Sequence, residues 1–163
     1  MNDVRRGRHA ALRRLAAVLG ITYLVALALI AFWPAPVDRG VHGPLVSLLA
    51  ALQRHGAPGW LTYNFVEFAA NIALFVPVGL LGVILVGARH WWFAIFAGFA
   101  ASFCIEFGQL VFLPARFATV NDIIANTFGA ACGAALALVV IGITHAWPSA
   151  GTNSPTARRL YTP

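Results

Sequence analysis

Charged residues are scarce in this chain. Asp, Glu, Lys and Arg make up 10% of its 163 residues, whereas about 25% is usual in soluble domains. Hydrophobic residues make up 60%, and the mean hydropathy is +0.80. Such a chain cannot cover a water-facing surface, so this composition excludes a soluble domain. It predicts a small all-α integral membrane protein.

Lysine is absent, and cysteine is nearly so. All basic residues are Arg, and they lie at the chain ends and in short polar segments rather than in one patch, which argues against a nucleic-acid partner. Cys104 and Cys132 fall inside apolar runs, with no spacing typical of a disulfide framework or a metal site. His42 and His55 have no second ligand at metal spacing. We therefore predict no metal and no cofactor.

Long apolar runs are what the sequence does have. They predict four transmembrane helices, at 15–33, 65–87, from the Arg89–Trp92 turn to about 113, and 119–147, each near the roughly 20 residues that span a bilayer. The first run follows a basic segment, 1–14, as in a signal peptide. It is longer than a signal sequence requires, and Phe32-Trp33-Pro34 offers no small-residue cleavage site, so we expect it to be retained. Residues 15–147 then form one four-helix membrane domain.

Two segments outside the spans have their own character. Residues 44–54 place Leu45, Leu48, Leu49 and Leu52 on one stripe, which predicts a short helix lying in the membrane interface within the first external loop. Residues 148–163 are rich in Ser, Thr and Pro, which predicts a disordered cytoplasmic tail.

The distribution of arginine predicts the orientation in the membrane. Four spans place both termini on one side, and that side carries eight of the arginines against three on the other: Arg5, Arg6, Arg8, Arg13, Arg14, Arg89, Arg158 and Arg159 against Arg39, Arg54 and Arg116. Because cytoplasmic segments carry the excess of positive charge, we expect both termini to be cytoplasmic.

Polar side chains recur at helical spacing in the third and fourth spans. Ser102, Glu106 and Gln109 share one face, and Asp122 and Asn126 share another. With the predicted topology these residues converge near the outer membrane face, where the second span begins and Arg116 lies in the turn. We predict an outward-facing polar pocket whose ligand-binding residues are Glu106, Gln109, Arg116, Asp122, Asn126, Glu67 and Asn71.

Several of these residues also have structural explanations. An unpaired carboxylate in hydrocarbon is expensive, so Glu106 either serves a ligand or forms an ion pair with Arg116. Thr119 and Asp122 fit a helix capping box. The remaining positions are predicted to serve packing, with a kink at the proline and close helix contacts at the small residues: Pro77, Gly79, Gly98, Ser102, Gly129 and Gly133.

The motif Ser-x3-Glu-x2-Gln, followed by Arg116 and Asp-x3-Asn-x2-Gly-x3-Gly, resembles the hallmark of the VanZ-like family of small bacterial membrane proteins. The segment 71–79, Asn-Ile-Ala-Leu-Phe-Val-Pro-Val-Gly, resembles a second motif of that family, and the likeness covers about residues 64–137. It implies a multi-pass protein of the bacterial plasma membrane, associated with resistance to glycopeptides such as teicoplanin.

Three functions fit this sequence. The first is a non-enzymatic envelope protein that binds a lipid-linked cell-wall precursor, a glycopeptide or another amphiphile. The second is a membrane-embedded enzyme that uses Glu106 and Asp122 as acid and base on a phosphate-bearing lipid. The third, an ion or proton carrier, ranks last because the cytoplasmic halves of the second to fourth spans lack ionisable residues.

Overall fold

A computed structural model describes residues 2–33, 40–113 and 119–146. These residues contain helices and no strand. The helices are α1 (Asn2–Ala31), α2 (His42–Arg54), α3 (Tyr63–Val86), the 3-10 helix η1 (Ala88–His90), α4 (Trp91–Phe112) and α5 (Val120–Ala146). Four segments are long and apolar enough to cross a membrane: Ala10–Ala31, Tyr63–Val86, Ala88–Phe112 and Val120–Thr144. The prediction of an all-α protein with four spans is confirmed for this part of the chain.

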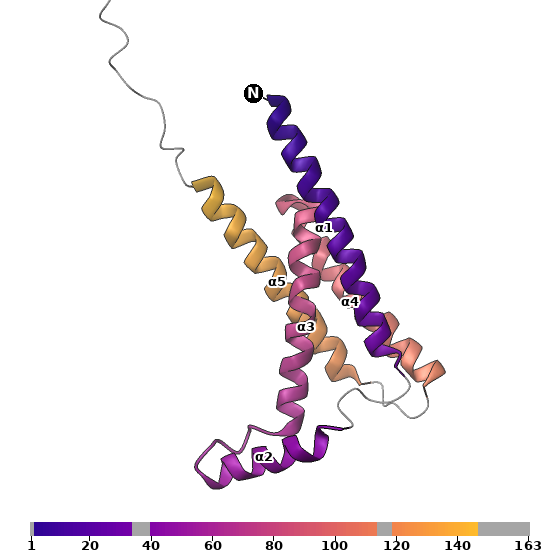
Figure 1. Ribbon diagram of the computed structural model, residues 1–163, viewed down its shortest axis with the longest axis vertical. Helices are drawn as coiled ribbons and strands as arrows, with labels where there is room; N and C mark the ends of the chain where they lie inside the picture. Colours follow the sequence, from indigo (N-terminus) through magenta and orange to yellow (C-terminus); the bar gives the residue numbers. More distant parts are fainter. Residues whose placement is uncertain (1, 34–39, 114–118, 147–163) are drawn as a thin grey trace, which may run out of the picture.

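The long helices run alternately up and down, and α2 lies across one end of the bundle (Figure 1). The starts of α3 and α5 and the end of α4 lie toward that end, whereas the start of α1 and the end of α5 lie at the opposite end (Figure 1). α1 begins at Asn2 and therefore includes most of the basic segment that we expected to precede the span, because arginine, alanine and leucine favour helix. The predicted turn at Pro114–Arg116 and the predicted tail at 148–163 lie outside the described residues.

The beginning and end of α3 follow local side-chain and backbone chemistry. The hydroxyl of Thr62 accepts a hydrogen bond from the backbone N–H of Phe65 at 3.3 Å, as expected of a threonine N-cap. At the other end, Gly87 has φ +87°, a conformation that other residues rarely adopt. The glycine ends the helix and lets the chain turn into η1 and α4.

Glycine brings α3 and α5 together at backbone distance. A methyl group added at Gly79 would overlap the carbonyl oxygen of Ala130, and one added at Gly133 would overlap that of Val76. Gly129 lies in the same way against Ile72. Between membrane helices, where lipid is as apolar as a leucine side chain, such close contact is the main source of attraction. These contacts fix how α3 and α5 pack.

Two polar bonds attach α1 to α3. The hydroxyl of Tyr23 donates to the carbonyl of Leu74 at 2.7 Å, and the guanidinium of Arg13 donates to the carbonyl of Leu85. Pro77 has no N–H, which leaves the carbonyl of Ala73 without its helical donor. Tyr23 bonds the next carbonyl along α3, that of Leu74.

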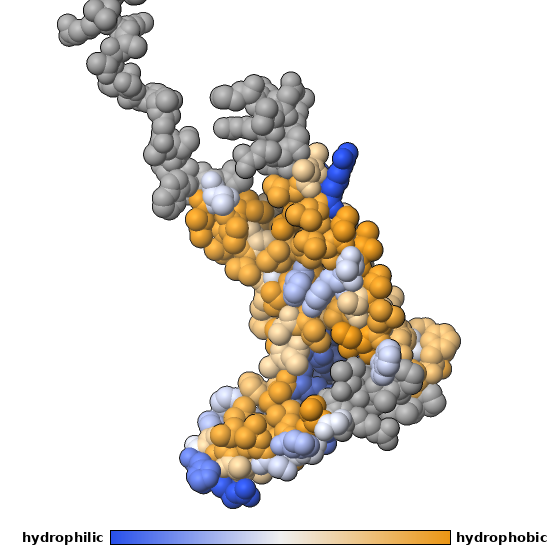
Figure 2. Space-filling model, viewed as in Figure 1, coloured by the Kyte–Doolittle hydropathy of each residue, from blue (hydrophilic) through white to orange (hydrophobic). Residues whose placement is uncertain are grey.

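Most apolar side chains on the long helices remain exposed. Within the four spanning windows, between 11% and 28% of residues are buried. On the face drawn in Figure 2, hydrophobic surface covers the long helices, and hydrophilic residues gather toward α2. A surface of this kind is covered by the lipid bilayer, so the protein is a multi-pass membrane protein.

Candidate functional site

Polar side chains from three helices meet in the half of the bundle nearer α2. α4 ends there while α3 and α5 begin there, so the antiparallel arrangement brings together residues far apart in the sequence. The set consists of Asn71 on α3, Ser102 and Glu106 on α4, Thr119 before α5, and Asp122 and Asn126 on α5. They form three hydrogen-bonded pairs that link neighbouring helices.

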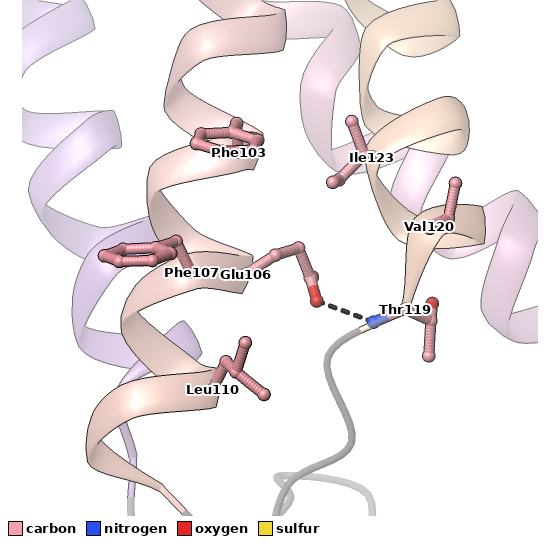
Figure 3. A pocket seen from close by; sticks show the side chains of 7 residues that line it. All are labelled: Phe103, Glu106, Phe107, Leu110, Thr119, Val120 and Ile123. Atoms are coloured by element: carbon pink, nitrogen blue, oxygen red, sulfur yellow. Dashed lines mark hydrogen bonds between the residues drawn. The ribbon is translucent and has the colours of Figure 1, made fainter.

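The pair nearest the helix ends joins Glu106 to the start of α5. Its Oε2 accepts a hydrogen bond from the backbone N–H of Thr119 at 2.9 Å (Figure 3), although the residue is only 7% exposed. The hydroxyl of Thr119 in turn accepts from the N–H of Asp122 at 3.1 Å. The predicted capping box is therefore right for the threonine and wrong for the carboxylate, because Glu106 of α4 takes the place of Asp122.

The second pair links α3 to α5. The side-chain amide of Asn71 donates to Oδ1 of Asp122 at 2.6 Å, and the contact is partly buried. Asp122 accepts this bond through Oδ1, while the N–H of Thr119 is satisfied by Glu106. A carboxylate in the first turn of α5 also interacts favourably with the positive end of the helix dipole.

The third pair is the most buried. Nδ2 of Asn126 donates to Oγ of Ser102 at 2.9 Å, and the two residues are 5% and 0% exposed. Oδ1 of Asn126 is also buried, and within the described part of the chain it has no hydrogen-bond partner. If the side-chain amide of Asn126 were rotated by half a turn, Oδ1 would face Ser102 and Nδ2 would be the atom without a partner. This pair therefore contains one unsatisfied polar atom, which typically costs about 1–3 kcal/mol.

The unsatisfied atom leads to a prediction. Asn126→Leu removes one interhelical hydrogen bond, worth about 0.6 kcal/mol in membrane helices, together with the unsatisfied oxygen. The hydroxyl of Ser102 loses its partner, but a serine in a helix can bond a carbonyl of its own preceding turn. We therefore expect its free energy of unfolding, measured in detergent, to stay the same or to rise by about 1 kcal/mol. Ser102→Ala is the matched control. It removes only the partner, leaves both polar atoms of Asn126 unpaired, and should lower stability by about 1–2 kcal/mol. A large loss for Asn126→Leu would contradict this account.

A groove opens between α4 and α5 beside the first pair. It has a volume of about 170 Å³. Glu106 and Ile123 point into the space between the two helices, and Thr119 lies at the start of α5 (Figure 3). The lining residues are Phe103, Glu106, Phe107, Leu110, Thr119, Val120 and Ile123. The groove therefore combines a carboxylate with apolar and aromatic walls.

The other residues proposed from the sequence lie around this site. Nε2 of Gln109 donates to the carbonyl of Ala31 at 2.8 Å, so this side chain bonds the last residue of α1. Glu67 is exposed on α3, one turn before Asn71. Arg116, and with it the predicted ion pair to Glu106, lies outside the described residues. Within the described ranges there is no group of three or more His, Cys, Asp or Glu residues able to hold a metal ion.

The apolar walls of the groove were not predicted from the sequence. Phe99, Phe103 and Phe107 recur every four residues on α4, and this spacing was the one available signal. It marks an aromatic face, which on a membrane helix looks the same whether it contacts bulk lipid or lines a groove.

Four helices able to span a membrane, three of them linked by buried polar pairs, define a helical multi-pass membrane protein. The model of the family described as VanZ/LLP1 matches residues 20–141, more than half of the chain. The protein belongs to the VanZ/LLP1 family, which confirms the resemblance of its motifs. A search of curated proteins and of solved structures finds no significant match to the chain.

Proposed function

We propose that this protein is a non-enzymatic component of the bacterial cell envelope that binds a lipid-linked or amphiphilic ligand. The observation that supports this most is the setting of Glu106, whose carboxylate is buried within the bundle and also lines an open groove. A carboxylate at membrane depth is a functional-site hypothesis by default. Beside apolar walls, it suits a ligand that has both a polar head and a hydrocarbon part.

The ligand we propose is a lipid-linked cell-wall precursor or a glycopeptide of the teicoplanin type, with antibiotic resistance as the outcome. Glu106, Asp122, Asn126 and Asn71 would form the polar side of the site. Arg116, in the segment that joins α4 to α5, would contact an anionic group of the ligand. Gln109 would act indirectly, by holding the end of α1 beside the site.

We also propose that the site faces outward from a plasma membrane, with both termini in the cytoplasm and α2 in the outer interface. The count of arginines supports this orientation, as does the location of the polar cluster toward the end of the bundle that carries α2.

Cysteine labelling tests the orientation. In a chain with Cys104 and Cys132 replaced by alanine, Gly59→Cys places a thiol in the exposed segment after α2, and Arg89→Cys places one at the opposite end. In intact cells a membrane-impermeant maleimide should label position 59 at once and position 89 only after the membrane is opened. The reverse pattern would overturn both the topology and the outward site.

A second function has one specific observation in its favour. Glu106 is buried and bonded to a backbone N–H, whereas Asp122 is less buried and bonded to an amide. Two carboxylates in different environments can serve as acid and base, as an enzyme acting on a phosphate-bearing lipid would require.

Purified protein incubated with polyprenyl phosphate and polyprenyl diphosphate separates the two functions. We expect saturable binding without turnover on thin-layer chromatography, and we expect Glu106→Gln, which removes a negative charge from the site, to change the affinity. Turnover that is lost in Glu106→Gln would establish the enzyme instead. Absence of both binding and turnover, together with unchanged glycopeptide susceptibility in a deletion strain, would reject the proposed function.

A further inference from the structure

We infer that the groove between α4 and α5 holds a hydrocarbon chain of a membrane lipid, which enters sideways from the bilayer. This inference rests on the proposed function, because the groove shares Glu106 and Thr119 with the polar site. To the proposed function it adds the direction from which the ligand enters and the place where the apolar part of the ligand binds.

The walls of the groove lie on the lateral surface of the bundle. Phe103 is 51% exposed, Phe107 58% and Leu110 66%, and all three belong to the spanning part of α4. In a membrane these side chains contact lipid rather than water. An apolar cavity of about 150 Å³ accepts a benzene-sized molecule, so a groove of about 170 Å³ can hold a short stretch of hydrocarbon chain.

A row of phenyl rings extends this path along α4. Ring centroids are 6.4 Å apart from Phe96 to Phe99, 6.3 Å from Phe99 to Phe103, and 6.3 Å from Phe103 to Phe107. At a rise of 1.5 Å per residue, positions 96 to 107 span roughly 16 Å of helix. This apolar track is long enough to contact an extended chain over much of its length.

The polar groups give the bound lipid a direction. The groove borders Glu106 and Thr119 near the end of α4, whereas the aromatic row continues away from them toward the start of that helix. An amphiphile in this seat would place its head near Glu106, toward the end of the bundle that carries α2. Its chain would run along Phe107, Phe103 and Phe99.

Photo-crosslinking tests the seat. The full chain is reconstituted into vesicles that contain phosphatidylglycerol with a diazirine on one acyl chain, and crosslinked positions are mapped by mass spectrometry. We expect crosslinks to concentrate on 99–110 and 120–123. Ile123→Trp fills the groove and should reduce them at least fivefold. Ile124→Trp, at a position 53% exposed and not among the residues that line the groove, should leave them unchanged.

Several results would overturn the inference. These are crosslinks spread evenly over all lipid-facing helices, crosslinks equally strong in Ile123→Trp, or a phenyl row that carries no lipid crosslinks, which would mean that a second copy of the chain rather than lipid covers that row. If Ile123→Trp fails to fold, as judged by its melting temperature, Val120→Trp at the more exposed rim of the groove replaces it. Excess unlabelled polyprenyl phosphate should compete for the crosslinks, and free fatty acid at the same concentration should compete less.

Failure of this inference differs from failure of the proposed function. If the hydrocarbon chain does not bind in the groove but the polar site is right, Ile123→Trp leaves crosslinking unchanged while Glu106→Gln still changes the affinity for polyprenyl phosphate. If the seat is right but the proposed function is wrong, Ile123→Trp removes the crosslinks while Glu106→Gln alters neither ligand binding nor glycopeptide susceptibility.

Discussion

Gly133→Ala should lower the free energy of unfolding by about 3 kcal/mol, at the upper end of what overpacking a core usually costs. The added methyl group would overlap the carbonyl oxygen of Val76 and approach the backbone nitrogen of Leu80 to 2.9 Å. Both are backbone atoms, so no change of rotamer can relieve the overlap. α3 and α5 would have to move apart and lose the contacts that hold them.

The same helix provides a matched control. Gly142 also lies on α5, but a methyl group added there meets nothing within 4 Å. Because alanine favours helix over glycine by about 0.8–1.0 kcal/mol, Gly142→Ala should be neutral or stabilising. Thermal unfolding of both variants in detergent measures the difference. If Gly133→Ala is fully stable but inactive, the glycine serves chemistry rather than packing.

If the protein confers glycopeptide resistance as proposed, Glu106→Gln should abolish that resistance while reducing stability by less than about 1 kcal/mol. The amide keeps an oxygen that can accept from the N–H of Thr119, so the start of α5 remains capped. Glu106→Leu removes the acceptor and leaves that N–H without its acceptor, which should cost about 1–3 kcal/mol. Comparison of the two variants separates the effect of the charge of Glu106 from the effect of its hydrogen bond.

Melting temperature and glycopeptide susceptibility, measured in one strain background, decide the outcome. If Glu106 is instead the buried partner of Arg116, Glu106→Gln leaves an uncompensated charge, and stability should fall by about 3 kcal/mol. A stable variant with full resistance would show that this pocket is not the working site.

The sequence was sufficient to predict the helices, because each apolar run has the length that a bilayer requires. It also predicted that Asn71, Glu106, Asp122 and Asn126 would approach one another, since helical spacing puts polar residues on shared faces and antiparallel spans bring those faces together. Their roles as ligand contacts stay predictions.

The hydrogen-bond partners could not be predicted in the same way. Gln109 shares a face with Glu106 by spacing, yet its amide bonds the carbonyl of Ala31, because the end of α1 lies beside that turn of α4. Glu106 of α4, rather than Asp122, bonds the N–H of Thr119 because its side chain reaches across to the start of α5. The spacing of residues along one helix does not show how far a side chain reaches toward another helix. The groove was missed because its walls are apolar residues that membrane helices carry everywhere.

The hydrogen bond between Glu106 and Thr119 links ligand binding in the groove to the backbone at the start of α5. The carboxylate that lines the groove is also the acceptor for the first N–H group at the start of α5. A ligand group that attracts this carboxylate competes directly with a peptide N–H. If the ligand succeeds, the N–H of Thr119 loses its acceptor, and only the Thr119 hydroxyl still caps that end of α5. Binding at the site would thus change the local helical order at the start of α5, the residue range that directly follows the segment carrying Arg116.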